Sequence, residues 1–315
     1  MNKQFEVSSL VLCYKPNLKK LIMTLKSLIY QKDVCMQIVI ADDGSEIDHF
    51  DEIKAFFAEN NFEDYVLVKN PKNVGTVKNC ISGMEKCEGS YIKGISPGDY
   101  LAEQKSLRNW LDYMKSNNLS VCGSDYYCYH FNAEGKVEYT KALLNPRITG
   151  LKGGKLRFDY LINNDLFLGA AILCQRELFQ KYLRLIDNKV VYAEDNTYRI
   201  MAYCGEKMGF FNQRAVIYEV GTGISTSNDG NWLRLIRKDW ETTDNIMLTM
   251  PTKDIKLQKI FKKFKMLKMT GGYKYLSYLK LRGLVLLKLR ARIRPRISSR
   301  NLPIEWIKKI GGDVA

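Results

Sequence analysis

Runs of apolar residues alternate with helical patterns through the first hundred residues of the chain. Val7 to Tyr14 is a short run rich in β-branched residues, and it predicts a buried strand. The apolar residues that follow recur every three or four positions and predict a helix: Leu18, Leu21, Ile22, Leu25, Leu28 and Ile29. A second strand is expected over residues 37–41, and it ends in the polar sequence Asp-Asp-Gly-Ser.

The same alternation continues to about residue 95. We expect a helix over residues 47–58, a strand over 65–68, a helix over 75–86 and a strand over 91–95. Strands that alternate with helices are typical of βαβ units and a parallel sheet. The chain is therefore predicted to have an α/β fold.

The rhythm loosens beyond about residue 120. Extended segments are expected over residues 119–129, 167–174, 208–211 and 215–219, and helices over residues 193–204 and 232–250. We divide the chain into a first domain of residues 1–220, a connecting loop and helix of residues 221–251, and a helical tail of residues 252–315.

Composition fits a globular protein with a sizeable core. Of the 315 residues, 46% are apolar and 26% are charged. The sequence shows neither a signal segment nor the roughly 18 consecutive apolar residues of a spanning helix, so we expect a cytoplasmic protein. The eight cysteines form no CxxC pair and several lie in apolar runs, which favours buried reduced thiols over a zinc site.

Positive charge is concentrated at the end of the chain. Between Lys253 and Lys309 there are 18 Lys and Arg and two acids, whereas the rest of the chain has 31 basic residues and 32 acids. Within the tail, apolar residues recur at helical spacing with lysines between them: Leu257, Ile260, Phe261, Phe264 and Leu267. This pattern indicates either a helix that binds an anionic membrane surface or a helix that packs its apolar stripe on the domain. The tail contains no nucleic-acid recognition module, so we expect no nucleic-acid partner.

Polar and glycine-rich residues follow three of the predicted strands. Tyr14 follows the first, Asp42 and Asp43 follow the second, and Ser-Pro-Gly-Asp, ending at Asp99, follows the fourth. Ligands of an open parallel sheet bind beyond the carboxyl ends of its strands. Two acidic strand ends at one edge suit Mg²⁺ or Mn²⁺ and a phosphorylated ligand. An Asp-Gly after a strand, taken alone, is also an ordinary turn.

A later acidic pair is Glu194 and Asp195, with Arg199 one helical turn after Asp195. Taken alone, this pattern fits a capped helix start with an ion pair between residues four apart.

Four sequence blocks, in order, resemble family 2 glycosyltransferases of the GT-A fold. They are VSSLVLCYKPN with the later QIVIADDGS, then KNVGTVKNCISGMEKCEGSYIKGISPGDYL, FLGAAILCQRELF and AEDNTYRIMAYCGEKMGFF. The resemblance covers about the first 220 residues. It implies a GT-A fold, which is a mixed, mostly parallel sheet flanked by helices, and transfer of a sugar from a nucleotide-diphosphate donor.

The resemblance also implies roles for individual residues. Tyr14 and Asp43 would contact the base and ribose of the donor, and Asp42 would support that turn. The remaining nucleotide-sugar site would be formed by Asn73, Gly75, Asn79 and Gly98. Asp195 would be the general base, with Glu194 beside it and Arg199 orienting the pair.

The metal motif is incomplete, because the family usually has acids where this chain has Ser96 and Gly98. Asp99 is the remaining acid and the expected ligand of Mn²⁺ or Mg²⁺. One carboxylate together with the diphosphate and waters could hold such an ion. A metal-independent site, in which Lys93 or the tail neutralises the diphosphate, is the alternative.

These patterns lead to one functional hypothesis. We expect an inverting glycosyltransferase that moves a sugar, with a UDP-sugar as the first candidate donor, to a growing surface glycan of the capsule or lipopolysaccharide type. The acceptor would be a glycan or lipid-linked oligosaccharide, and the enzyme would lie peripherally on the inner face of the plasma membrane. The alternative is a catalytically inactive GT-A-like protein at the membrane that binds nucleotide sugars or acts as a scaffold for partners. A Rossmann dehydrogenase is excluded, because the first turn, Cys-Tyr-Lys-Pro, lacks a glycine-rich loop.

Overall fold

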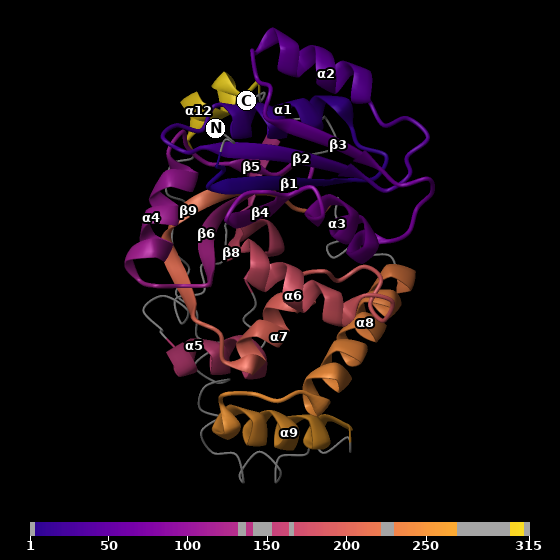
Figure 1. The fold of residues 1–315 in the computed structure, drawn as a ribbon, viewed down its shortest axis with the longest axis vertical. Helices are drawn as coiled ribbons and strands as arrows, with labels where there is room; N and C mark the ends of the chain where they lie inside the picture. The colour runs from indigo at the N-terminus through magenta and orange to yellow at the C-terminus, as the bar shows by residue number, and fades with distance from the viewer. Residues whose placement is uncertain are drawn as a thin grey trace.

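One curled sheet with helices on both sides forms the centre of the protein (Figure 1). The structure is a computed structural model, and it describes residues 4–131, 137–140, 153–163, 167–221, 230–269 and 303–311. Strands and helices alternate in the first half, as the sequence predicts. These elements are β1 (Val7–Cys13), α1 (Leu18–Ile29), β2 (Met36–Asp42), α2 (Phe50–Glu59), β3 (Tyr65–Lys69), α3 (Thr76–Met84), β4 (Tyr91–Ile95), β5 (Tyr100–Leu101) and α4 (Ser106–Ser116).

The second half adds antiparallel strands and a layer of helices. Its elements are β6 (Val121–Phe131), β7 (Val137–Thr140), α5 (Gly153–Phe158), a π-helical turn (Asp159–Asn163), a 3₁₀ turn (Gly169–Ala171), β8 (Ile172–Gln175), α6 (Arg176–Ile186), α7 (Asn196–Cys204), β9 (Met208–Glu219), α8 (Gly230–Thr249), α9 (Ile255–Met269) and α12 (Ile304–Lys309).

One expectation for this half was confirmed and one was wrong in detail. The extended segments expected over residues 208–211 and 215–219 both belong to one strand, β9, which continues past a register shift opposite Ser124 and Asp125 of β6. A bulge of this kind bends a strand without ending it. The strand expected over residues 167–174 is extended in its second half, because residues 169–171 form a 3₁₀ turn.

The sheet has the strand order β3-β2-β1-β4-β8-β6-β9-β5, with β7 paired to β6. Strand β1 is parallel to both β2 and β4, so the carboxyl ends of these three strands lie at one edge. Cys13 at the end of β1 pairs with Asp42 at the end of β2. This shared edge brings together the polar residues that the sequence placed after separate strands.

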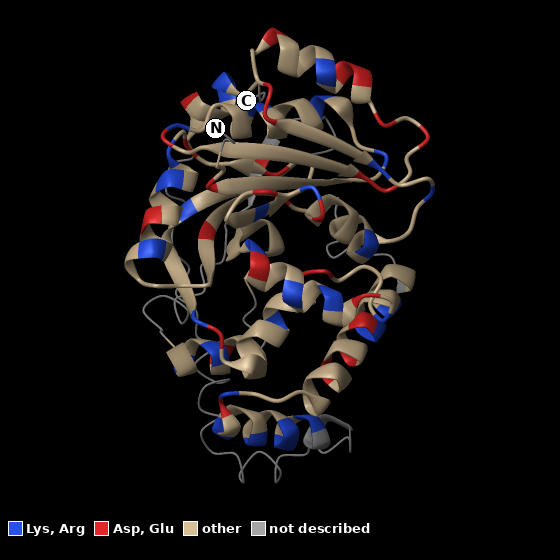
Figure 2. Ribbon diagram, in the orientation of Figure 1, with Lys and Arg blue, Asp and Glu red and all other residues tan. Residues whose placement is uncertain are grey.

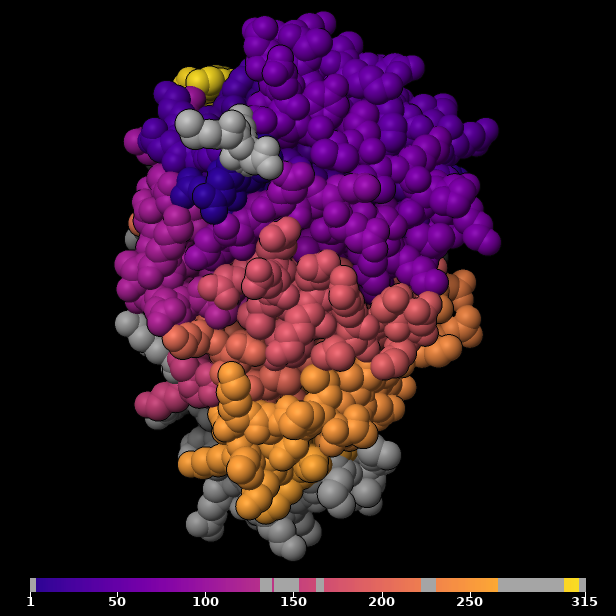
Figure 3. All heavy atoms as spheres, in the orientation of Figure 1, coloured from indigo at the N-terminus to yellow at the C-terminus, as the bar shows by residue number. Residues whose placement is uncertain are grey.

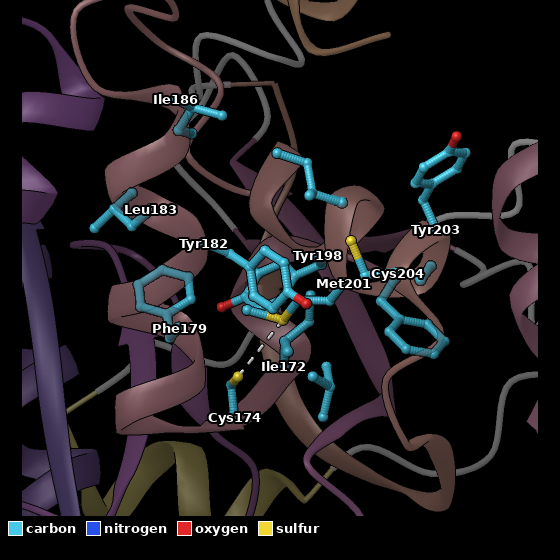
Figure 4. Packing of buried hydrophobic residues seen from close by; sticks show 14 of the residues in the cluster. Ile172, Cys174, Phe179, Tyr182, Leu183, Ile186, Tyr198, Met201, Tyr203 and Cys204 are labelled. Atoms are coloured by element: carbon cyan, nitrogen blue, oxygen red, sulfur yellow. Dashed lines mark hydrogen bonds between the residues drawn. The ribbon is translucent and has the colours of Figure 1, made fainter. Parts of the chain in front are cut away.

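Apolar side chains fill both faces of the sheet. On one face, α6 contributes Phe179, Tyr182, Leu183 and Ile186, whose spacing puts them on one side of the helix. Figure 4 shows these residues packed with the side chains of α7 and with Cys174 of β8. On the other face, α1, α2 and α4 cover the sheet. All eight cysteines have free thiols.

The described part of the tail packs on the domain at two separate places. Leu257 and Phe261 of α9 are buried in the same core as α6 and α7, and the Phe261 ring contacts Tyr203 with centroids 5.4 Å apart. Trp306 of α12 lies beside β5, where its Nε1 donates to the Leu101 carbonyl at 2.6 Å. Figure 1 shows α9 and α12 at opposite ends of the molecule.

This packing matches the second alternative for the α9 segment, in which the apolar stripe faces the domain. The exposed lysines of α9 are Lys256, Lys259, Lys262 and Lys263, whereas Lys265 forms an ion pair with Asp244 of α8. Figure 2 shows basic residues recurring along this helix. Figure 3 shows α8 and α9 covering the end of the molecule beyond residues 167–221. The expected basic stretch between residues 270 and 302 lies outside the described residues.

Candidate active site

Asp42 forms hydrogen bonds within the turn after β2. Its carboxylate accepts the Ser45 backbone N–H at 2.7 Å and the Ser45 hydroxyl at 2.5 Å. The Ser45 oxygen in turn accepts the Lys15 backbone N–H at 2.7 Å. Asp42 therefore joins the turn after β2 to the turn after β1.

Asp43 holds the loop in front of α3. Its two carboxylate oxygens accept the backbone N–H groups of Val74 at 2.8 Å and Gly75 at 3.0 Å. Gly75 has φ +91°, and a Cβ there would lie 2.6 Å from the Val191 side chain, so a larger residue would be strained. Asp43 is 4% exposed, and its Oδ1 also accepts the Asn70 side-chain amide at 3.4 Å.

Asn79 is a buried connector of the same edge. Its side-chain amide donates to the Ala41 carbonyl at 2.9 Å and accepts from Asn70 at 3.0 Å. Tyr14 and Asn73, by contrast, are exposed. Of the nucleotide-side residues, Tyr14 and Asn73 are therefore the ones whose side chains face solvent, while the others shape the turns beneath them.

Gly98 and Asp99 lie against Glu219 at the end of β9. The Glu219 backbone N–H donates to Asp99 Oδ1 at 3.0 Å. Gly98 has φ +104°, and a Cβ there would lie 2.2 Å from Glu219 Oε2. The Glu219 carboxylate thus occupies the space of the side chain that position 98 lacks. Lys20 of α1 forms an ion pair with the other Glu219 oxygen.

Lys93 is fully buried between Asp99 and the turn that precedes β8. Its ammonium donates to the carbonyls of Gly94 and Ala170. Burial lowers the pKa of Lys93 to about 7, against the opposing effect of the Asp99 charge. Burial also raises the pKa of Asp99 to about 7, although the Glu219 amide and Lys93 oppose the shift.

The donor set does not fit a dedicated divalent-metal site. Within the described residues no group of three or more His, Cys, Asp and Glu side chains could hold a metal ion. Asp99 uses Oδ1 to accept an amide, and Glu219 is paired with Lys20. A metal bound here would therefore need most of its ligands from the diphosphate and water.

Glu194 and Asp195 form a half-buried acidic pair just before α7. Burial raises the pKa of the Glu194 carboxyl to about 8, and the charges of Asp195 and Asp239 add to that shift. Burial also raises the pKa of Asp195, and the charge of Arg199 opposes the shift. A carboxylate with a raised pKa is a stronger base, which suits proton abstraction from a hydroxyl.

Arg199 points from α7 toward α8. Its Nη2 donates to Asp244 at 2.7 Å, and its guanidinium stacks on the Trp240 ring, 4.6 Å from the centroid. The carboxylate that Arg199 pairs with is therefore on α8. Asp195 lies one helical turn before Arg199, at the start of α7. Arg199 acts on Asp195 through its charge.

Two chains of contacts bring the acidic pair to the strand edge. On one side, Asp43 holds Gly75, and the Val77 N–H donates to the Val191 carbonyl at 3.0 Å, three residues before Glu194. On the other side, Lys93 beside Asp99 donates to the Ala170 carbonyl. A Cβ on the adjacent Gly169 would lie 3.2 Å from Asp195 Oδ2. These contacts link the segments that carry Asp43, Asp99 and Asp195.

The sequence reading missed Lys20, Glu219, Asp239 and Asp244. Lys20 and Glu219 are 199 residues apart, and no local pattern joins them. Asp239 and Asp244 did carry a signal, since they fall on the same helical face as the apolar Ile236 and Met247. Charged residues within an apolar stripe indicate buried partners.

The comparison with known families agrees with this geometry. A family profile described as Glycosyl transferase family 2 matches residues 9–183. The chain therefore belongs to glycosyltransferase family 2. It is similar to the uncharacterized glycosyltransferase EpsJ of Bacillus subtilis strain 168, with 23% identity over 199 residues that make up 61% of this chain and 55% of EpsJ. The chain thus spans about half the length of this curated relative.

Solved structures of TarS from S. aureus are similar in fold. The crystal structure of TarS 1–349 aligns with 97% of this chain and 81% of its own, with a TM-score of 0.57 and 13% identity. The complex of TarS 1–349 with UDP-GlcNAc aligns with 82% of this chain and 71% of its own, with a TM-score of 0.54 and 16% identity. The complex with UDP covers 84% and 72%, with a TM-score of 0.52 and 14% identity. The expected GT-A fold is confirmed.

Proposed function

We propose that the protein transfers a sugar from a nucleoside-diphosphate donor to a hydroxyl group of a glycan. The observation that carries this proposal is the contact of the Asp43–Gly75 edge with the segment that leads to Glu194 and Asp195. A donor bound at the strand edge would place its sugar toward a carboxylate of raised pKa. TarS has been solved with UDP and with UDP-GlcNAc. That likeness supports a UDP-sugar as the donor.

The proposed reaction is a single displacement with inversion. Asp195 accepts the proton of the acceptor hydroxyl, and the oxygen forms a bond to the anomeric carbon as the bond to the nucleoside diphosphate breaks. Burial and the Asp195 and Asp239 charges raise the pKa of Glu194, whereas the Arg199 charge opposes the rise of the Asp195 pKa. Asp195 is therefore the better candidate for the base.

Negative charge develops on the leaving diphosphate and needs a cation beside it. Mn²⁺ or Mg²⁺ would supply that charge when bound, with Asp99 as the residue that holds it. Lys20 and Lys93 are the cations that the protein itself places next to Asp99 and Glu219. This arrangement supports transfer that depends weakly on metal.

The acceptor is proposed to be a growing surface glycan or lipid-linked oligosaccharide at the inner face of the plasma membrane. The exposed lysines of α9 support this location, because each basic residue near an anionic surface contributes about 1 kcal/mol. Since the apolar stripe of α9 is buried in the domain, the attraction of this helix would be electrostatic. Across the described residues, every helix is too short or too polar to cross a bilayer.

A panel of donors tests the function directly. UDP-, GDP- and dTDP-sugars are incubated with the protein, each with Mn²⁺ and with a chelator, while hydrolysis and thermal shift are measured. We expect one UDP-sugar to be hydrolysed and to raise the melting temperature, with the chelator reducing both effects only modestly. Donor binding without turnover would favour the catalytically inactive alternative. Neither binding nor turnover with any donor would contradict the proposal.

A further inference from the structure

Helix α8 presents buried polar side chains to the segment that carries Glu194 and Asp195, here called the acidic pair. Asp239, Thr243 and Asp244 are each at most 4% exposed. Asp239 and Thr243 are four residues apart and lie on one face of the helix, and Asp244 is the next position around it from Thr243. A buried carboxylate is costly unless its oxygens have partners, so the partners indicate what this face does.

Asp239 accepts three consecutive backbone N–H groups. Tyr192 donates to its Oδ2 at 2.7 Å, and Val191 and Ala193 donate at 3.1 and 3.2 Å. Successive amides that point to one anion form a concave anion site, and here the anion is a side chain 46 to 48 residues further along the chain. The backbone that leads into the acidic pair is therefore oriented by α8.

Two more contacts hold the helix that follows the acidic pair. Asn196 donates its side-chain amide to Thr243 Oγ1 at 3.0 Å. Arg199 pairs with Asp244 and stacks on Trp240. Helix α8 thus contacts the chain both before and after the acidic pair.

The same segment contacts the donor side of the site. The Val191 carbonyl accepts the Val77 N–H of α3 at 3.0 Å, while the Val191 N–H donates to Asp239. The segment is thus fixed from both directions, by α3 at the nucleotide edge and by α8 behind it. A displacement of this backbone would move the acidic pair relative to the donor.

We propose that Asp239 is a positioning residue for the acidic pair, acting through the amides of Val191, Tyr192 and Ala193. Thr243 and Asp244 extend the same hold to α7. The proposal rests on the proposed function for what the pair does, whereas the hold itself is a property of the fold. Misplacing a reacting group by about 1 Å can lower a rate by roughly a hundredfold, so loss of this hold should reduce turnover more than donor binding.

Three variants test the hold. Asp239→Ala removes all acceptors, Asp239→Asn keeps one oxygen without the charge, and Glu241→Gln is the matched control, because Glu241 is exposed on the same helix. Hydrogen–deuterium exchange is measured for peptides that cover residues 190–195. Exchange should accelerate roughly tenfold to a hundredfold in Asp239→Ala, less in Asp239→Asn and not in the control, because hydrogen bonds to a charged acceptor are lost.

The same variants are then compared for kinetics with the donor that the panel identifies. Turnover should fall about tenfold or more in Asp239→Ala, with the dissociation constant for the nucleoside diphosphate within about twofold of wild type. Asp239→Asn should recover part of the turnover. Unchanged exchange in Asp239→Ala, or faster exchange with wild-type turnover, would overturn the proposal.

The experiment also distinguishes a folding defect of Asp239→Ala from failure of the proposed function. If Asp239→Ala does not fold, as judged by circular dichroism, Asp239→Asn and Thr243→Val carry both measurements with the same criteria. If the wild-type protein turns over no donor, the proposed function fails and the positioning role fails with it. The exchange data then still decide whether Asp239 holds this backbone.

Discussion

The ion pair between Lys20 and Glu219 links α1 to the end of β9 beside Gly98 and Asp99. The Glu219 side chain is 3% exposed and that of Lys20 is 23% exposed. Among the residues that the structure describes, buried Glu219 Oε2 has no hydrogen-bond partner. Lys20→Met would therefore leave the buried Glu219 carboxylate without its ion-pair partner.

Breaking a buried ion pair by removing one partner costs about 3–5 kcal/mol. Because Lys20 keeps some contact with solvent, we expect Lys20→Met to lower the free energy of unfolding by about 2–3 kcal/mol. The double variant Lys20→Met/Glu219→Gln removes the buried charge as well, and it should recover at least about half of that loss. Recovery of stability in the double variant is expected for a buried ion pair. For an exposed pair, the losses of the two single variants would nearly add.

Urea unfolding of the wild type, both single variants and the double variant provides the four free energies of a double-mutant cycle. The control is Lys86→Met, which removes an exposed lysine elsewhere on the domain. A loss below about 0.5 kcal/mol in Lys20→Met, or a double variant as unstable as the sum of the single variants, would refute the reasoning.

Three further predictions concern the donor edge, the buried charges and α9. Gly75→Ala forces a Cβ to 2.6 Å from the Val191 side chain at φ +91°. The substitution should lower the free energy of unfolding in urea by about 1–3 kcal/mol and weaken nucleoside-diphosphate binding. Wild-type values of both quantities would contradict this prediction. Burial raises the Asp99 pKa from 3.8 to about 7. Between these two pH values the folded protein binds a proton that the unfolded chain has lost, so the contribution of Asp99 to the free energy of unfolding falls as pH rises from about 4 to 7. Asp99→Asn should flatten the dependence of unfolding free energy on pH in that window, and an unchanged slope would count against it. Charge reversal on α9 should reduce binding to anionic vesicles at least about tenfold at low salt, whereas the control Lys86→Glu should not. Equal binding by all variants would show that α9 is not the part of the protein that contacts the membrane. The α9 variant combines Lys259→Glu, Lys262→Glu and Lys263→Glu.

The first half of the fold could be predicted because its signals are local. The apolar run of β2 is buried along its whole length and that of β1 except at half-buried Leu12, and β4 begins and ends where the pattern placed it. Helices α4 and α6 were missed although Leu107, Trp110, Leu111 and Met114 have the spacing of a buried face. The helical period of α4 was present in the sequence and would have predicted this helix.

No local signal showed which distant segments pair with one another. The bulge in β9 depends on its pairing with β6, which lies about 90 residues earlier in the chain. The Glu219 carboxylate beside Gly98 and the Asp239 carboxylate beneath Val191 join segments 46 to 121 residues apart. The candidate site residues could be named from the motifs, but their partners could not, because those partners are set by tertiary packing.

The most direct test of the account is the comparison of donor binding and turnover in Asp195→Asn. The substitution keeps the size and hydrogen-bonding shape of the side chain and removes its ability to take a proton. We predict that transfer falls by about 10²- to 10⁴-fold while the nucleoside-diphosphate dissociation constant changes by less than about threefold. Wild-type turnover in this variant would contradict the assignment of Asp195 as the base.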